Sequence, residues 1–226
     1  MNIIVTGANR GVGLGLSRYL AARGDTVIAA AREPFSAELR QLQLRTIALD
    51  VTSAESIRSF AIALGDLPID IAFNVAGVYG SQANLGSLAL DLELADIAHT
   101  YQVNALGPLR LTLAVLPNIR RGTAKKLVHV TSGMGSMADN TSGGSYGYRM
   151  SKAALNMMSV SLAVDLRPEG IASYVINPGW VKTDMGGAGA PLTVTQSVEA
   201  IVREVDRATF ADSGAFLNWK GNRYPW

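Results

Sequence analysis

The 226-residue chain contains no cysteine and only two histidines, His99 and His129. Without cysteine there can be no disulfides, no thiolate catalysis and no cysteine-based zinc site. Neither histidine has other potential metal ligands at suitable spacing, so we expect no metal centre. His129 lies in the apolar run Leu127–Val130 and is expected to be packed and satisfied in the core.

Charge is also scarce, because charged residues make up 17% of the chain and the net charge is +2. This balance gives no reason to expect a nucleic-acid partner. No apolar run is long enough to span a bilayer, and the first residues lead into a strand-like segment without a basic region or cleavage site. We therefore expect a cytoplasmic protein that binds neither membrane nor nucleic acid.

Hydrophobic residues are abundant, at 48%, and short apolar runs alternate with helical patterns along the chain. The length suits one domain, residues 1–226. The expected strands are Ile3–Thr6, Thr26–Ala30, Arg45–Leu49, Ile69–Asn74, Leu127–Thr131, Ala172–Ile176 and Ala215–Leu217. The expected helices are Gly11–Arg23, Ala54–Leu64, Asp91–Leu116, Tyr148–Leu166 and Ser197–Ala208. This alternation predicts an α/β fold with a doubly wound, mostly parallel sheet of seven strands and helices on both faces.

A glycine-rich turn, Gly7-Ala8-Asn9-Arg10-Gly11-Val12-Gly13, joins the first expected strand to the first helix. Glycines let the backbone turn sharply and approach a diphosphate closely, and the free N–H groups at a helix start attract phosphate. The turn therefore predicts a dinucleotide site, although three glycines also occur in many ordinary turns.

Two arginines indicate which dinucleotide is bound. The second strand leads into Arg32, at a place where an acidic residue would bind the ribose 2′-hydroxyl of NAD. Arg32 and Arg10 instead suit the 2′-phosphate of NADP(H), which guanidinium groups bind in a bidentate manner. The alternative is that both are ordinary surface arginines, and Glu33 lies close enough to complicate the interpretation.

Further cofactor contacts are expected after the third and fourth strands, because ligands bind at the carboxyl ends of strands in open α/β sheets. Asp50 is a candidate acceptor for the adenine amino group; alternatively it caps the next helix, for which the threonine and serine that follow are better placed. The residues after the fourth strand are either cofactor contacts or a simple turn. The candidates are Asp50, Val51, Asn74, Ala76 and Gly77.

A proton-transfer site is predicted from Tyr148 and Lys152, four residues apart on one expected helix. The ammonium should lower the pKa of the phenol, which can then donate or accept a proton. Ser132 ends the fifth strand and is a candidate to orient a carbonyl, or else a turn former. Asn104 lies within a long helix beside a Gly-Pro pair, which should disturb the helix there. Tyr146 is the rival phenol but has no lysine four residues later.

The expected helix over Met150–Leu166 is apolar on every side. One side must face the sheet, and the other faces either a covering loop or a second subunit. We favour a homo-oligomer, a dimer or tetramer, with the helices Asp91–Leu116 and Tyr148–Leu166 at the interface.

These motifs resemble the short-chain dehydrogenase/reductase family of classical type, and within it the sniffer and C-factor-like carbonyl reductases. The resemblance covers nearly the whole chain. The family motifs occur in order as Thr6-Gly7-x-x-x-Gly11-x-Gly13, Asn74-x-Ala76-Gly77, Asn104, Ser132, Tyr148-x-x-x-Lys152 and Pro178-Gly179. The narrower resemblance rests on Asn9-Arg10, residues 183–187 and residues 221–226.

The resemblance implies a single Rossmann domain. It also implies a role for each of four residues, Asn104, Ser132, Tyr148 and Lys152, which we call the tetrad. Tyr148 would be the catalytic acid/base, Ser132 would hold the substrate oxygen, and Lys152 would bind the nicotinamide ribose. Asn104 would support a proton relay. The remaining implied cofactor contacts are Pro178, Gly179, Val181 and Thr183, of which Val181 and Thr183 would lie against the nicotinamide carboxamide.

We therefore expect NADPH-dependent reduction of an aldehyde or ketone to the alcohol, by hydride transfer with a tyrosine general acid. The alternative is a nucleotide-binding signalling protein of the C-factor type with little turnover. Residues 183–193 are short and rich in Gly and Ala where many family members carry a helical lid, so an open pocket is expected. The pocket candidates are Met134, Met137, Ala138, Tyr146, Trp180 and Met185.

Overall fold

The computed structural model describes residues 1–80 and 90–226, which contain a seven-stranded sheet in the order β3-β2-β1-β4-β5-β6-β7. Every neighbouring pair of these strands is parallel, so the predicted doubly wound parallel sheet is confirmed. The strand order reverses between β1 and β4, which is where such sheets bind ligands. The strands are β1 (Asn2–Thr6), β2 (Thr26–Ala31), β3 (Arg45–Ala48), β4 (Ile71–Asn74), β5 (Lys126–Val130), β6 (Ala172–Asn177) and β7 (Phe216–Asn218).

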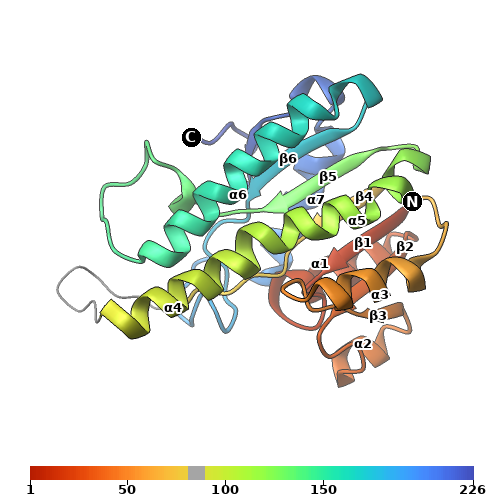
Figure 1. Ribbon diagram of the computed structural model, residues 1–226, viewed down its shortest axis with the longest axis horizontal. Helices are drawn as coiled ribbons and strands as arrows, with labels where there is room; N and C mark the ends of the chain where they lie inside the picture. The colour runs from red at the N-terminus through yellow and green to blue at the C-terminus, as the bar shows by residue number, and fades with distance from the viewer. Residues whose placement is uncertain (81–89) are drawn as a thin grey trace.

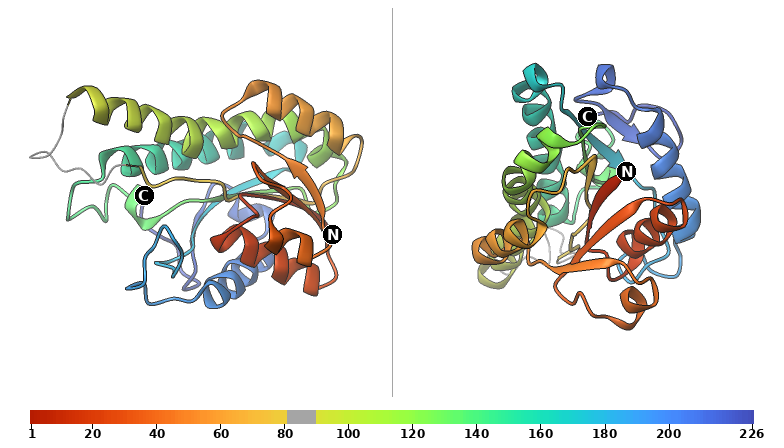
Figure 2. Two further views of the ribbon diagram at one scale, coloured as in Figure 1. Left: turned by 90° about the horizontal axis from the view of Figure 1, so that it is seen from below. Right: turned by 90° about the vertical axis from the view of Figure 1, so that its right-hand side faces the viewer.

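Helices cover both faces of the sheet and give the molecule three layers (Figures 1 and 2). One hydrophobic cluster lies between the sheet and α1 and α7, and a second lies between the sheet and α3, α5 and α6. The helices are α1 (Gly11–Ala22), α2 (Ala37–Gln41), α3 (Ala54–Leu64), α4 (Leu90–Tyr101), α5 (Gly107–Arg121), α6 (Tyr146–Asp165) and α7 (Val194–Arg207). None of these described helices has both the length and the apolar composition needed to cross a bilayer.

The long helix expected at Asp91–Leu116 is divided into α4, a π-turn at Gln102–Leu106 and α5. The N–H of Gly107 donates to the carbonyl of Gln102, five residues earlier. Pro108 follows in the first turn of α5 and has no N–H with which to continue the α-helical ladder. The disturbance predicted around Asn104 is thus present, but α4 and α5 still run on as one rod (Figure 1).

Local capping explains the other differences from the predicted elements. Helix α7 begins at Val194 and not at Ser197, because Thr193 and Gln196 form a capping box. Helix α2 was not predicted, since its five residues are too short to show a helical period.

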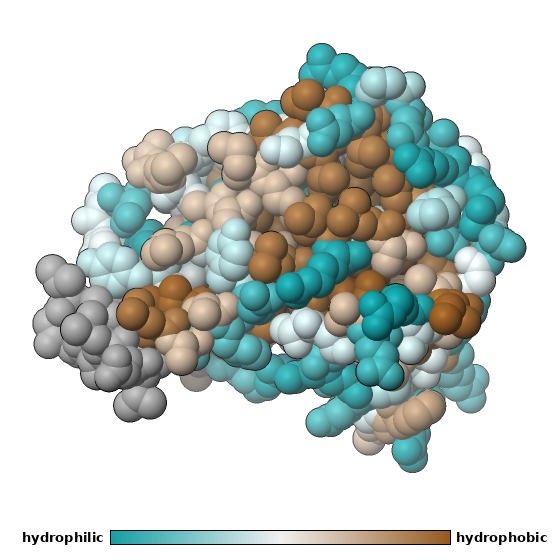
Figure 3. All heavy atoms as spheres, viewed as in Figure 1, coloured by the Kyte–Doolittle hydropathy of each residue, from teal (hydrophilic) through white to brown (hydrophobic). Residues whose placement is uncertain are grey.

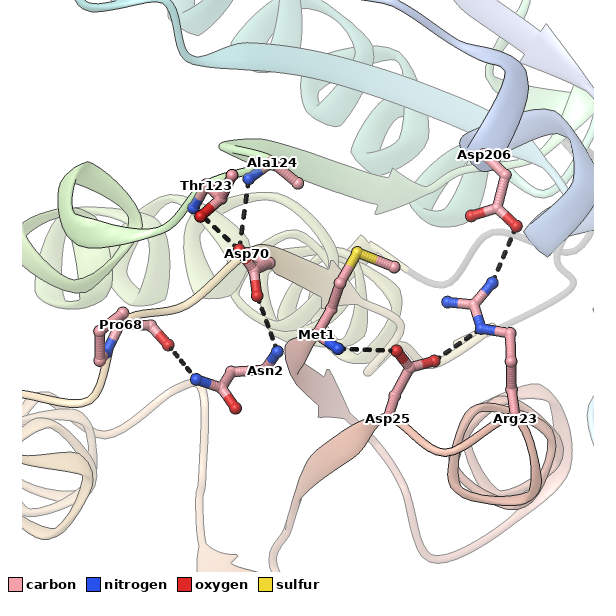
Figure 4. Close-up of polar contacts among 9 residues, drawn as sticks. All are labelled: Met1, Asn2, Arg23, Asp25, Pro68, Asp70, Thr123, Ala124 and Asp206. Atoms are coloured by element: carbon pink, nitrogen blue, oxygen red, sulfur yellow. Dashed lines mark hydrogen bonds and ion pairs between the residues drawn. The ribbon is translucent and has the colours of Figure 1, made fainter.

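The amino-terminal edge of the sheet is held together by Asp70, which lies between β1 and the turn before β5 (Figure 4). Its Oδ2 accepts from the N–H of Asn2 at 2.8 Å, and its Oδ1 accepts from the N–H groups of Thr123 and Ala124 at 2.8 and 3.3 Å. Burial acts to raise the pKa of Asp70, but these three donors outweigh it, and the pKa is lowered. This cluster lies at the edge opposite to the site described next.

Candidate active site

The turn after β1 needs glycines for both its backbone conformation and its packing. Gly11 has a φ of +54°, in the left-handed region that favours glycine. Gly13 packs so tightly that a Cβ built on it would lie 2.2 Å from the carbonyl oxygen of Gly7. Arg10 provides no side-chain cap for α1, and the first turn of α1 contains no acidic residue. The positive N-terminus of α1 is therefore available to an anion.

The predicted residues after β4 lie directly beside this turn. The hydroxyl oxygen of Thr6 accepts from the N–H groups of Val75 and Ala76 at 2.9 and 3.0 Å. Val12 lines the large cleft described below, whereas Asn9 lines a smaller groove of about 310 Å³ beside α1. The glycine turn and the end of β4 thus form one continuous surface.

The two arginines expected to bind a 2′-phosphate have different neighbours. Nη1 of Arg10 lies 3.6 Å from Oδ2 of Asp184, and both side chains are exposed. The charge of Arg32 lies close enough to Asp50 to help lower the pKa of that carboxyl. Within the described part of the chain, no contact joins Arg10 to Arg32, so their joint use stays a prediction.

Asp50 is already engaged by its own loop. Its Oδ1 accepts from the N–H and the hydroxyl of Thr52 at 2.9 and 2.7 Å, and these bonds are the main reason for its lowered pKa. Ser53, and not Asp50, caps α3, as the sequence suggested. Val51 is buried, and a Cβ built on Gly107 would lie 2.8 Å from its Cγ2.

Tyr148 and Lys152 lie one turn apart near the start of α6, and both are buried. Nζ of Lys152 donates to the carbonyl of Val130 at 2.9 Å and lies 5.7 Å from the centroid of the Tyr148 ring. Burial lowers the pKa of Lys152 to about 8. The rival phenol, Tyr146, begins α6 and is 38% exposed.

The structure corrects the expected pKa of Tyr148. Burial raises this pKa to about 12, while a side-chain hydrogen bond with Ser132 acts to lower it and the neighbouring Tyr79 adds to the rise. Burial of the phenol dominates, and the ammonium of Lys152, 5.7 Å from the ring centroid, does not reverse the rise. The phenol is therefore protonated at neutral pH, and it lines the same cleft as Ser132, the serine that would hold a substrate oxygen.

Asn104 lies in the π-turn and is fully buried. Its Oδ1 accepts from the N–H of Val78 at 2.9 Å, and its Nδ2 donates to the carbonyl of Val78 at 2.8 Å and to Oγ of Ser151 at 3.0 Å. A Cβ built on Gly77 would lie 3.2 Å from Oδ1 of Asn104 and 3.7 Å from Nζ of Lys152. The asparagine thus joins the segment after β4 to α6, next to the lysine.

The side chain of Asn74 is buried and faces His129 on β5. The two are hydrogen-bonded through Nδ2 of Asn74 and Nδ1 of His129, 3.1 Å apart. Nδ1 is then the acceptor, so the hydrogen is carried by Nε2, which has no partner among the described residues. The expectation of a packed His129 is confirmed, but the ring is only half satisfied. Burial, with the charge of Lys152, lowers its pKa to about 3, so the ring is neutral.

The segment after β6 carries the remaining predicted cofactor residues and forms a folded loop without a helix between Gly179 and Leu192. Lys182 N–H donates to the carbonyl of Leu192 at 2.8 Å, and Pro178 accepts from the hydroxyl of Ser197 at 2.7 Å. The residues Pro178, Gly179, Val181 and Thr183 all line the large cleft. The absence of a helical lid from this loop agrees with the open pocket expected from its composition.

A cleft of about 730 Å³ opens at the carboxyl ends of the strands and includes Ser132 and Tyr148. Of the expected pocket residues, Met134, Trp180 and Met185 line it. Met137, Ala138 and Tyr146 are not among the described residues that line it. Met137 is 76% exposed, and Ala138 is held by a bond from its N–H to the carbonyl of Trp226 at 2.8 Å.

The chain's last residues complete the wall of this cleft, which sequence reasoning missed. Tyr224 donates its hydroxyl to Asp139, and a Cβ on Gly133, next to Ser132, would lie 2.5 Å from the Tyr224 hydroxyl oxygen. The N–H of Tyr224 donates to the carbonyl of Phe216 at 2.8 Å. The sequence offered one indication that Tyr224 belongs to the site: it lies within residues 221–226, which carry the narrower family resemblance. Tyr79 and Arg149, which also line the cleft, carried no such signal.

Along one edge of the sheet, an uncapped helix start and a tightly packed glycine turn meet the buried pair Tyr148 and Lys152 and the half-buried Ser132. Such a surface fits a dinucleotide whose diphosphate lies at α1 and whose reactive end reaches the phenol.

Comparison with known proteins agrees with this geometry. A family model for short chain dehydrogenases matches residues 1–190. The chain is 48% identical to the C-signal protein of Myxococcus xanthus over 170 residues, which are 75% of this chain and 100% of that protein. It is 36% identical to the 1-hydroxy-2-glutathionyl-2-methyl-3-butene dehydrogenase of a Rhodococcus species over 231 residues, 99% of each chain.

Two solved structures are similar over the full length. The NADPH-bound carbonyl reductase from chicken fatty liver has a TM-score of 0.90 and 32% identity, covering 100% of this chain and 98% of that one. The carbonyl reductase Sniffer of D. melanogaster has a TM-score of 0.91 and 30% identity, covering 100% and 99%.

Proposed function

The chain belongs to the short-chain dehydrogenase family of oxidoreductases, and on that premise we propose that it reduces an aldehyde or ketone to the alcohol with NADPH. The observation that carries the proposal is the buried phenol of Tyr148, which lines the cleft together with Ser132 and lies one helical turn from the buried Lys152. The similarity to two carbonyl reductases, one of them bound to NADPH, supports it.

The cofactor would lie along the edge from the glycine turn to the cleft. The N-terminus of α1 would bind the diphosphate, Arg10 and Arg32 the 2′-phosphate, and Lys152 the nicotinamide ribose. When bound, NADPH would supply the hydride. Pro178, Gly179 and Val181 would contact the nicotinamide from the other wall of the cleft.

The chain's own residues would supply the proton and its geometry. Ser132 would hold the substrate oxygen, and Tyr148 would donate its hydroxyl proton to that oxygen. The raised pKa keeps the proton on the phenol at neutral pH, which is the form that a general acid needs before the transfer. Asn104 would position α6 against the segment after β4, through its bonds to Val78 and Ser151.

A variant pair tests this function. NADPH and NADH consumption should be followed spectrophotometrically with a panel of activated aldehydes, quinones and diketones. Tyr148→Phe should bind NADPH but lose nearly all turnover, while Tyr146→Phe, which removes the exposed phenol two residues earlier, should keep it. Normal turnover by Tyr148→Phe would refute the mechanism.

The similarity to C-signal favours a second candidate function, a nucleotide-bound signalling protein with little turnover. The intact group of Tyr148, Lys152 and Ser132 weighs against a purely binding role. Expression of Tyr148→Phe in a deletion strain separates the two: full restoration of the phenotype would favour signalling, and failure would favour chemistry.

We also propose that residues 1–226 act as one cytoplasmic domain that associates into a homodimer or homotetramer. Large apolar side chains are exposed on α4, α5 and α6, and apolar residues spread over the face that α5 and α6 form (Figure 3). The exposed residues are Leu94, Leu113, Met150, Met157 and Val164, each more than half exposed. A second copy covering this face would bury them.

A further inference from the structure

Three charged side chains line the cleft: Arg149, Lys220 and Asp139. None of them takes part in the chemistry proposed above. Arg149 directly follows Tyr148 in the first turn of α6, and both residues line the cleft.

Every hydrogen bond of the Arg149 side chain in the described structure goes to a neutral acceptor. Nε donates to the carbonyl of Gly143 at 3.1 Å, Nη1 to the carbonyl of Met134 at 3.4 Å and Nη2 to Oγ of Ser142 at 2.8 Å. A guanidinium has five N–H donors, so two stay free. No carboxylate among the described residues lies within salt-bridge distance of it.

The other two charges leave the cleft with an excess of positive charge. The carboxylate of Asp139 accepts the hydroxyl of Tyr224, so a neutral donor already solvates it. Nζ of Lys220 lies 5.6 Å from the ring centroid of Trp219 and forms no ion pair in the described structure. The N-terminus of α6, which also lies here, adds positive potential in the same sense.

We propose that the cleft selects carbonyl compounds that also carry a carboxylate, and that Arg149 binds this group. The proposal rests on the proposed carbonyl reduction and names its substrate class. A half-buried guanidinium with free donors gains far more from a carboxylate than from water, because charge-assisted bidentate bonds are the stronger kind. Lys220 adds attraction at the rim of the cleft.

Arg149 also holds residues 142 and 143 against Met134, so its loss could disturb the cleft in a way unrelated to charge. The test must therefore measure a ratio between two ligands of one shape. The acid 4-formylbenzoate and its neutral ester, methyl 4-formylbenzoate, form such a pair. A disturbed loop changes both affinities together, whereas a lost ion pair changes only that of the acid.

Binding of each aldehyde to the protein with NADP+ should be measured by quenching of the fluorescence of Trp180 and Trp219, which line the cleft. The variants are Arg149→Met, Arg149→Lys and the control Arg167→Met, which removes an exposed arginine after α6. We expect the wild type to prefer the acid, and Arg149→Met to lower the acid-to-ester ratio about tenfold. Arg149→Lys should keep part of the preference, and Arg167→Met all of it.

A wild type that does not bind the acid more tightly than the ester would overturn the proposal, as would an unchanged ratio in Arg149→Met. Turnover of the same two aldehydes is a separate measurement. If neither is reduced while the acid preference depends on Arg149, the reaction proposed for the site is in doubt and the anion site stands.

Discussion

The ring of Tyr79 lies stacked on the ring of Tyr148, with centroids 4.5 Å apart and planes inclined by 20°. The Tyr79 hydroxyl lies 3.2 Å from Oγ of Ser145 and 3.5 Å from Sδ of Met134. The segment that leaves β4 therefore contacts one face of the Tyr148 ring directly.

Tyr79→Ala should reduce carbonyl turnover about two- to tenfold, because an aromatic pair of this kind contributes about 0.5–1.5 kcal/mol. It should also lower the pKa of Tyr148, which burial and Tyr79 both raise. Since alcohol oxidation needs the phenolate, its pH profile should move to lower pH. Tyr79→Phe keeps the stacked ring and is the control for turnover, although it also removes the hydroxyl that acts on the pKa of Tyr148. The same profile for wild type and Tyr79→Ala would argue against this role.

The kcat/KM for NADPH should fall as the pH rises above about 8. The pKa of Lys152 is lowered by burial to about 8, so its positive charge is lost as the pH rises through that value, while Tyr148 keeps its proton up to about 12. The quantity to measure is kcat/KM for NADPH, which reports the free protein. Lys152→Arg, which stays charged, should show no such decline in its residual activity; a decline that persists in it would assign the step to another group.

Arg32→Ala should raise the KM for NADPH about tenfold and leave that for NADH little changed, because only NADPH has a 2′-phosphate for the guanidinium to bind. Arg32 is exposed and forms no ion pair within the described ranges. Arg58→Ala, which removes an exposed arginine from α3, is the matched control. Equal effects on both dinucleotides would show that Arg32 does not bind the 2′-phosphate.

Asp70→Asn should destabilise the fold by about 1–2 kcal/mol in urea unfolding, because one oxygen that accepts backbone N–H groups is lost. The pKa of Asp70 is lowered in the folded state, so its contribution is present above the ordinary aspartate pKa, about 4, and is lost as the pH falls through the lowered value. The difference in the free energy of unfolding between Asp70→Asn and the wild type should therefore become smaller at acidic pH. Asp165→Asn, at the exposed end of α6, should cost little at any pH.

Leu113→Glu combined with Met157→Glu should convert an oligomer to a monomer in light scattering after gel filtration. These side chains are 59% and 64% exposed on α5 and α6, and a charge on each would have to be buried in the proposed interface. Ile62→Glu, on α3 and 81% exposed, should leave the mass unchanged. An unchanged mass in the double variant would place the interface elsewhere.

Much of the fold was predictable because the sequence patterns of strands and of helices are both local. Buried parallel strands are apolar throughout, and helices repeat their apolar positions, so β1 and α3 were located to within a residue. The sequence predicted only that the helix would be disturbed near Asn104, and not that the disturbance would be a π-turn. A π-turn has one more residue in its hydrogen-bonded turn than an α-helix, and here it depends on both Pro108 and the packing of Asn104. Asn104, Ser132, Tyr148 and Lys152 were chosen as site residues through their spacing and the family resemblance, and their roles stay a prediction.

The surroundings of the site residues could not be predicted from the sequence. A pKa near 12 for Tyr148 results from burial by segments far away in the chain, which no local pattern encodes. The same holds for Tyr79 and Tyr224, whose side chains reach the site only after the strands have assembled. The half-satisfied His129 likewise depends on Asn74, 55 residues away.

The final residues of the chain have a consequence for solubility. Strand β7 is the last strand of the sheet, and it would expose unpaired backbone groups that invite pairing with another molecule. Residues 223 and 224 return along it in antiparallel fashion, with a bridge between Leu217 and Arg223. The segment that shapes the cleft therefore also shields the sheet from edge-to-edge aggregation, so a truncation that widened the pocket would leave a protein prone to precipitate.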